Sequence, residues 1–142
     1  MRTVREVLGR KGHEVWSIGP EESVFRALEW MAEKGIGALI VCEGERPVGI
    51  FSERDYARKV ILLGRSSRDT PVREIMTRRV VYVRPEQSVE QCMAVMTDKR
   101  VRHLPVLEGE RLVGVISIGD LVKSIIDEQR FLIEQLEQYI SG

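Results

Sequence analysis

The sequence predicts an α+β fold built from two copies of a β-α-β-β-α unit that pack as a pseudo-twofold pair. Residues 15–56 align without a gap on residues 80–121, and 17 of these 42 pairs are identical, which marks an internal duplication. In both copies, short runs of β-forming residues alternate with segments of helical period. One copy alone is too short to bury a stable core. We therefore expect two units that share a core, 1–70 and 71–142.

The elements follow in the same order in each copy. Ser23 and Ser88 stand directly before apolar segments of helical period, where serine is a helix-start signal. Two β-forming runs then flank the turn sequence Glu-Gly-Glu-Arg, which predicts a hairpin. A helical period closes each copy. The expected bounds are strands at 14–18 and 80–83, helices at 24–34 and 89–99, hairpins at 38–52 and 103–117, and closing helices at 53–63 and 119–140.

The composition excludes several classes of partner. Lys plus Arg and Asp plus Glu number 22 each, so no net charge favours binding to a nucleic acid or an anionic membrane. No apolar run approaches the roughly 20 residues that span a bilayer, and the N-terminus lacks an apolar signal core. Cys42 and Cys92 lie apart in apolar patterns, which favours buried thiols and no metal site. These features predict a cytoplasmic protein.

The pattern Gly-x-x-Ser-x-x-Asp occurs twice, within VGIFSERD at 48–55 and VGVISIGD at 113–120. In each copy the Ser ends a strand and the Asp falls in the first turn of the next helix. A carboxylate there can accept hydrogen bonds from two ribose hydroxyls, while the Ser hydroxyl and the free N–H groups can donate to a phosphate. The same residue types also cap helices without any ligand. Taken singly, each motif favours a cap, and it is the duplication of the spacing in a chain that also resembles a ligand-binding family that favours contact with a ligand.

With these motifs, the chain resembles a tandem pair of cystathionine-beta-synthase (CBS) domains, the Bateman module, of the stand-alone bacterial or archaeal type. The resemblance rests on the duplicated order of elements, the segment RHLPVLEGERLVGVIS and both Gly-x-x-Ser-x-x-Asp copies, and it covers nearly the whole chain. It implies two clefts between the paired sheets that bind AMP or a related adenosine compound such as ATP, NAD or S-adenosylmethionine. It implies no required cofactor and no metal.

The resemblance also implies which residues line the clefts. In the family the Asp binds the ribose, and the first strand and the start of the second strand bind the base. We expect crossed sites, in which the Asp of one unit faces the base-binding strands of the other. The first cleft would combine Ser52, Arg54 and Asp55 with Thr77, Val81, Arg102, His103, Leu104 and Pro105. The second would combine Ser117 and Asp120 with Trp16, Ile18, Gly37 and Ala38.

The two clefts are expected to differ in charge. Arg54, Arg102 and His103 would give the first cleft three phosphate donors, so it should prefer a charged phosphate tail. Small residues stand at the matching positions of the second cleft: Gly119, Gly37 and Ala38. Arg54 could instead be a solvated helix residue and His103 a structural histidine. The family order His-Arg is reversed here, which leaves open which of the two side chains reaches the phosphate.

Three further segments bear on function. The segment TVREVL at 3–8 echoes PVREIM at 71–76, outside the aligned repeat. The linker at 64–72 could close over a cleft or be a solvated connector. The far end of the helix at 119–140 has little of its own monomer left to cover, which predicts a homodimer.

The sequence favours a sensor over an enzyme. The two histidines, His13 and His103, lie beside no Ser or Cys in the pattern, so no nucleophile and base are expected to meet. We expect an adenine-nucleotide sensor in signal transduction that changes conformation or association when it binds its ligand, with a regulated partner protein that the sequence does not identify. The alternative is a structural dimerisation module with degenerate ligand sites.

Overall fold

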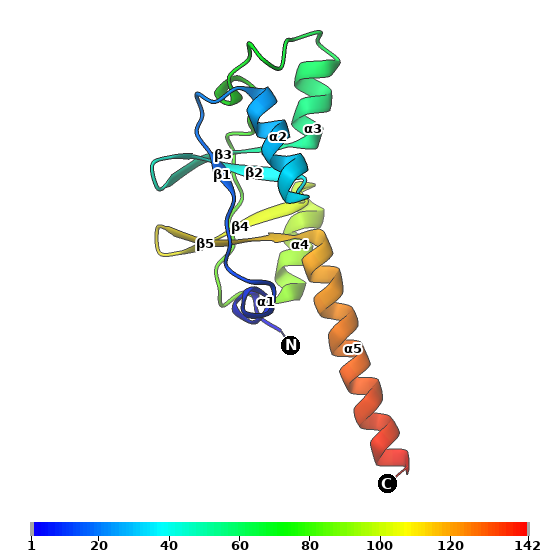
Figure 1. The fold of residues 1–142 in the computed structure, drawn as a ribbon. Helices are drawn as coiled ribbons and strands as arrows, with labels where there is room; N and C mark the ends of the chain where they lie inside the picture. Colours follow the sequence, from blue (N-terminus) through cyan, green and yellow to red (C-terminus); the bar gives the residue numbers. More distant parts are fainter. Residues whose placement is uncertain (1, 142) are drawn as a thin grey trace. The chain divides into compact units, whose positions relative to one another are not determined.

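The computed structural model describes residues 2–141 and has the predicted α+β architecture (Figure 1). One sheet has the strand order β1-β2-β3, in which β1 is parallel and β3 antiparallel to β2, and the other pairs β4 with β5. The strands are β1 (Ser17–Ile18), β2 (Ala38–Glu43), β3 (Arg46–Ser52), β4 (His103–Glu108) and β5 (Arg111–Ser117). The helices are α1 (Val4–Lys11), α2 (Val24–Lys34), α3 (Glu53–Tyr56), α4 (Val89–Lys99) and α5 (Ile118–Ser141), with a π-helical turn η1 (Ala57–Ile61) and a 3-10 turn η2 (Val72–Glu74).

The central helices of the two repeats, α2 and α4, have the bounds that the sequence predicts. Each starts after a serine whose hydroxyl accepts a hydrogen bond from a backbone N–H in the first turn, Ser23 from Arg26 and Ser88 from Gln91. At Ser88 the Gln91 side chain bonds back to the serine N–H and completes a capping box.

Three expected elements differ in the structure. The strand expected at 14–18 is reduced to Ser17–Ile18, and that expected at 80–83 is reduced to one parallel bridge between Val83 and Val106. The residues that fall outside the ladder lie at the N-terminal end of each expected strand; β1 pairs with β2 only through Ser17 and Ile18. The helix expected at 53–63 is a four-residue α3 followed by the π-helical η1.

The chain forms two compact units that cross the division expected at residue 70. We call them the β1–β3 unit (Glu14–Val81 with Gly109–Val113) and the α5 unit (Met1–His13, Tyr82–Glu108 and Gly114–Gly142). The difference arises because the segment before each repeat packs with the other repeat. Residues up to His13 thus belong with the second repeat, and the segment from 71 to 81 belongs with the first.

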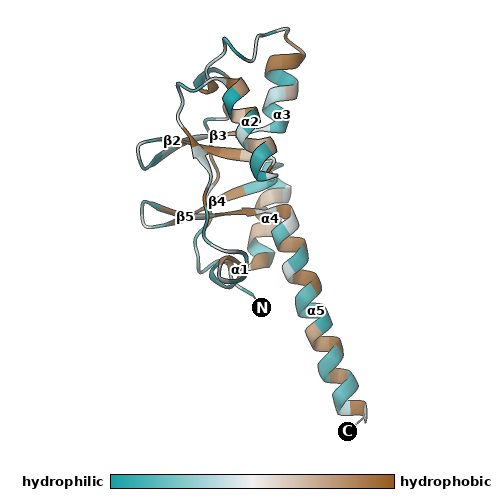
Figure 2. Ribbon diagram, in the orientation of Figure 1, coloured by the Kyte–Doolittle hydropathy of each residue, from teal (hydrophilic) through white to brown (hydrophobic). Residues whose placement is uncertain are grey.

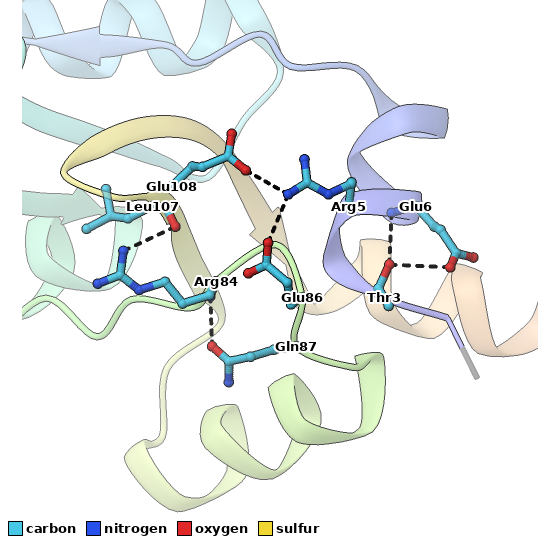
Figure 3. A network of polar contacts seen from close by, with 8 residues as sticks. All are labelled: Thr3, Arg5, Glu6, Arg84, Glu86, Gln87, Leu107 and Glu108. Carbon is cyan, nitrogen blue, oxygen red and sulfur yellow. Dashed lines mark hydrogen bonds and ion pairs between the residues drawn. The ribbon is translucent and has the colours of Figure 1, made fainter.

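The two docked segments make matching contacts within their units. The Val4 N–H donates to the Gln87 carbonyl, and the equivalent Val72 N–H donates to the Glu22 carbonyl, both at 2.8 Å. Arg5 pairs with Glu86 at 2.9 Å and with Glu108 at 2.6 Å, which raises the pKa of the exposed Arg5 guanidinium (Figure 3). In the other unit, Arg73 pairs with Glu21 at 3.0 Å. The echo of 3–8 in 71–76 is therefore a repeated docking segment.

The glycine of each Gly-x-x-Ser-x-x-Asp motif makes room for this segment. A Cβ placed on Gly49 would lie 2.7 Å from Met76 Sδ and 2.9 Å from the Thr77 carbonyl oxygen. A Cβ placed on Gly114 would lie 2.6 Å from Leu8 Cδ2. Leu8 and Met76 hold the same place in the echoed segments, so the glycines are explained by close packing.

The docked segments also complete the cores. The core of the β1–β3 unit includes three residues from the second docking segment, and Val4, Val7 and Leu8 of the first are buried in the α5 unit. The buried residues of the β1–β3 core are Ile18, Val24, Ala27, Met31, Leu39, Val41, Phe51, Val60, Val72, Ile75 and Met76.

Candidate functional site

The Ser and Asp of each motif form the same arrangement at the start of a helix. The Ser52 N–H donates to Asp55 Oδ2 at 3.0 Å, and the Ser117 N–H donates to Asp120 Oδ2 at 2.8 Å. In return, the aspartate N–H donates to the serine Oγ at 3.2 Å in both copies. The convergence expected from the sequence is present, and in both copies it caps the helix.

The Asp55 carboxylate is enclosed by donors from its own unit. Its Oδ1 accepts from Thr77 Oγ1 and from Lys59 Nζ, both at 3.0 Å, and its Oδ2 also accepts from Ser52 Oγ at 3.0 Å. Its side chain is only 8% exposed. The structure thus brings together the predicted site residues Ser52, Asp55 and Thr77 and adds Lys59. Each oxygen of Asp55 already has two donors.

The Asp120 carboxylate is more open and has a different cation. Lys11 Nζ lies 2.5 Å from Asp120 Oδ2 and also donates to the Val115 carbonyl at 2.6 Å. The Asp120 side chain is 22% exposed. Burial acts to raise the pKa of this carboxyl, but the hydrogen bond from Lys11 and the backbone N–H of Ser117 outweigh it, so the pKa lies below its ordinary value.

Lys11 was missed by reasoning from the sequence alone. A signal for it exists, because the echo between 3–8 and 71–76 can be extended to residues 11 and 79, which makes Lys11 the counterpart of Arg79. A basic residue at the same position of both echoed segments, Lys11 and Arg79, could have been read as a candidate for contact with the motif.

The start of the second strand in each repeat lies beside the motif of the same repeat. The Glu53 N–H donates to the Gly37 carbonyl at 3.1 Å, and the Ile118 N–H donates to the Arg102 carbonyl at 2.9 Å. The crossed pairing of Asp55 with Arg102 and of Asp120 with Gly37 would join residues of different units, and it stays a prediction.

The other predicted site residues fall into two groups. Arg54 and Arg102 are exposed, and Ala38, Val81 and His103 are half-buried, so their side chains can meet solvent. The side chains of the second group are buried in the core, which leaves only backbone groups for a ligand; this group is Ile18, Leu104 and Pro105.

Trp16 already has neighbours on its ring within the β1–β3 unit. The centroids of the Trp16 and Trp30 rings are 6.1 Å apart, and Lys34 Nζ lies 4.2 Å from the Trp16 centroid. A base that stacks on Trp16 would have to share the ring with Lys34.

Other kinds of site find no support in the described part of the chain. Residues 2–141 contain no group of three or more His, Cys, Asp or Glu side chains that could hold a metal ion. Cys92 is buried and Cys42 is half-buried, and burial raises the pKa of both thiols, that of Cys92 to about 11. Among the described helices, none combines the length and the apolar character needed to cross a bilayer.

Comparison with known proteins gives one family. The family model described as CBS domain matches residues 4–61 and 72–127. The CBS domain-containing protein CBSX3, mitochondrial, of Arabidopsis thaliana is 38% identical over 150 residues, which cover 99% of this chain and 72% of that protein. A solved protein with CBS domains from Burkholderia ambifaria MC40-6 is 53% identical with a TM-score of 0.87, over 90% of this chain and 96% of that one.

A third comparison concerns a structure with bound ligands. This CBS-domain pair was solved in complex with 5′-methylthioadenosine and S-adenosyl-L-methionine, and it is 21% identical with a TM-score of 0.79, over 90% of this chain and 98% of that one. At that identity the likeness concerns the fold. The family match and the two closer relatives show that this chain belongs to the CBS-domain family and that its two repeats are a CBS-domain pair.

Proposed function

We propose that the protein is a regulatory module that binds an adenine nucleotide at its Ser-x-x-Asp elements. The observation that carries the proposal is the same Ser and Asp arrangement at two helix starts of a CBS-domain pair. A carboxylate in that position suits the two hydroxyls of a ribose, and exposed basic side chains such as Arg54 and Arg102 suit a phosphate. AMP is the ligand we favour, with ATP, NAD and S-adenosylmethionine as the other candidates.

The wider role is part of the same proposal. The ligand would change the conformation or the association of the pair and so carry a signal to a partner protein, in the cytoplasm and without catalysis. A CBS-domain pair of the same fold holds adenosine compounds in its crystal, which supports the ligand class at the level of the fold.

Binding can be tested with AMP and adenosine, which share the base and the ribose and differ in the phosphate. At a hundred times its dissociation constant a ligand adds about 2.7 kcal/mol of stability, which for a chain of this size is a rise in melting temperature of roughly 5 to 11 °C. We expect AMP to raise it more than adenosine, and Arg102→Ala to remove the part of that difference that the first cleft contributes.

A matched pair of variants separates binding from general charge effects. Asp120→Ala should lower the affinity in one cleft, whereas Asp98→Ala removes an exposed carboxylate on α4, 76% exposed, and should leave binding unchanged. A protein whose melting temperature responds to none of AMP, ATP, NAD and S-adenosylmethionine would contradict the proposal.

The exposed half of α5 supports the second candidate, a dimerisation module, and the homodimer that either function would use. All side chains from Gln129 to Ser141 are exposed, and apolar residues recur along the helix to its end (Figure 2). One stripe has the alternating four- and three-residue spacing of a coiled-coil seam. Its members are Val122, Ile126, Gln129, Ile133, Leu136 and Ile140.

The charges beside this stripe indicate a second copy of the chain as its partner. Lys123, Arg130 and Glu137 follow one edge of the stripe at intervals of seven residues. In an antiparallel pair of α5 helices centred near residue 130, Lys123 of each chain would lie by Glu137 of the other, so opposite charges meet twice, while the two Arg130 side chains meet once at the centre. The other edge carries Ile125, Leu132 and Tyr139, which widen the apolar contact.

The dimer can be tested by sedimentation. The double variant Ile133→Glu/Leu136→Glu places charges in the stripe and should give monomers at concentrations where the wild type is dimeric. Gln135→Glu/Gln138→Glu adds the same charge on the other side of the helix and should not. Dimers of equal stability in both variants would contradict the role of α5.

A further inference from the structure

The Asp120 site contains a cationic side chain, Lys11, that was not among the residues expected there from the sequence. Lys11 is the last residue of α1, and its ammonium contacts Asp120 Oδ2 at 2.5 Å and the Val115 carbonyl at 2.6 Å. All three residues belong to the α5 unit. Gly119, Gly37 and Ala38 stand at the positions that match Arg54, Arg102 and His103, and they had suggested a second cleft without phosphate donors. Lys11 supplies one from a segment outside the aligned repeat.

Comparison of the two copies shows that Lys11 pairs with Asp120 from a different position than that from which Lys59 pairs with Asp55. There, Thr77 and Lys59 both donate to the carboxylate. The counterparts of these two residues in the second copy are Gly9, which has no side chain, and Ser124, whose buried Oγ has no hydrogen-bond partner within the described residues. Lys11 is therefore the cation that the structure gives to Asp120.

The Lys11–Asp120 pair is accessible to a ligand. The Lys11 side chain is 35% exposed and Asp120 is 22% exposed, so a ligand can reach both. A lysine has a flexible stem of four carbons, and its ammonium can turn from one acceptor to another without moving the helix. The 5′-phosphate of a nucleotide belongs to the same sugar as the hydroxyls that a carboxylate binds, so it lies within the span of such a side chain.

We propose that Lys11 is the phosphate-binding residue of the Asp120 site. Without a ligand its ammonium is held by Asp120 and Val115. When the ribose hydroxyls of an adenosine phosphate bind Asp120, the ammonium turns to the phosphate. Because Lys11 ends α1, occupation of the site changes a contact of the docking segment. This inference rests on the proposed nucleotide-binding function and names the group that selects a phosphate.

The test compares AMP and adenosine binding by isothermal titration in four proteins: wild type, Lys11→Met, Lys11→Arg and Arg10→Met. Arg10 is the exposed neighbour of Lys11 on α1, so its loss controls for charge. Lys11→Met should weaken AMP binding at one site about tenfold or more and leave adenosine binding unchanged or stronger, since a charge-assisted contact is lost and Asp120 is released. Lys11→Arg should keep the preference for AMP.

A second measurement does not depend on affinity. The phosphate of bound AMP titrates near neutral pH, and an ammonium beside it lowers that pKa. Phosphorus NMR should find the pKa of bound AMP lower in wild type than in Lys11→Met. Equal losses of AMP affinity in Lys11→Met and Arg10→Met, or an unchanged phosphate pKa, would overturn the role of Lys11 while binding itself stands. A wild type that binds neither compound would overturn the proposed function and this inference with it.

Discussion

Asp55 and Asp120 hold equivalent positions in the two repeats and share one helix-start cap, yet their other neighbours differ. The Asp55 side chain is 8% exposed, accepts a hydrogen bond from Thr77 and pairs with Lys59. The Asp120 side chain is 22% exposed and pairs with Lys11 of α1. The backbone part of the motif has been kept in both copies, and the side chains around it have diverged. A shared motif therefore identifies the position of a site but does not establish that both copies serve the same purpose.

The largest expected effect concerns the stability that each aspartate contributes. Asp55→Ala should cost about 3 kcal/mol in the free energy of unfolding, because it leaves a threonine hydroxyl, a lysine and a backbone N–H without their acceptor. Asp120→Ala should cost about 1 kcal/mol, because its partners are partly solvated. Urea denaturation of both variants measures the difference. Equal costs would mean that the burial of Asp55 has no energetic consequence.

The next effect concerns the two glycines of the motif. Gly49→Ala would press a methyl group against the carbonyl of Thr77, a residue that exchanges two backbone hydrogen bonds with Ile50, and should cost about 3 kcal/mol. Gly114→Ala would press first against the side chain of Leu8, which can shift, and should cost about 1 kcal/mol.

A control for these glycine variants is available in the same chain. At Gly19 the closest atom to an added Cβ is Glu22 Cγ at 4.0 Å, so Gly19→Ala should change the free energy of unfolding little. If all three variants unfold at the same urea concentration, close approach of the docking segment does not explain the glycines.

Much of this arrangement follows from the sequence, because the relevant signals are local or duplicated. The bounds of α2 and α4 and the two hairpins were predicted from caps, period and the repeated turn. The long helix expected at 119–140 is confirmed as α5, Ile118–Ser141. The Ser and Asp pairs were found because their spacing fixes them at a helix start.

The features that the sequence did not predict depend on contacts between residues that are far apart in the chain. Nothing local to residues 3–11 says that this segment docks on the second repeat, and the contact of Lys11 with Asp120 joins residues 109 positions apart. The same holds for Thr77 at Asp55, which the family resemblance supplied and the residues alone did not. β1 shows the opposite case. The β-forming run at 14–18 predicts a five-residue strand, but only Ser17 and Ile18 pair with β2.

A smaller effect separates Lys11 from the other groups around Asp120. The folded-state pKa of Asp120 is lowered, so the carboxylate contributes stability above its unfolded value of 3.8, and this contribution is lost as pH falls through the lower folded value. The stability difference between wild type and Asp120→Asn should therefore shrink below about pH 4. In a Lys11→Met background this pH-dependent part should be smaller, because Lys11 provides two of the causes. Acid denaturation followed by circular dichroism measures both; equal pH dependence in the two backgrounds would contradict the pairing.

The smallest expected effect compares the ends of the two central helices. Gly35 and Arg100 both close their helices in the left-handed conformation, at φ 65° and φ 56°, and Arg100 is the non-glycine residue with positive φ among residues 2–141. Left-handed backbone costs a residue with a Cβ about 1 kcal/mol, which glycine avoids. Arg100→Gly removes that cost together with the side-chain contacts of the arginine, so we expect a net gain of about 0.5 kcal/mol in the free energy of unfolding. Lys99→Gly, one residue earlier in the right-handed helix, should instead lose about 1 kcal/mol. Thermal and urea denaturation measure both variants, and the changes in the free energy of unfolding should have opposite signs if backbone conformation decides the outcome. A loss of stability in both would mean that the contacts of the Arg100 side chain outweigh the cost of its backbone conformation.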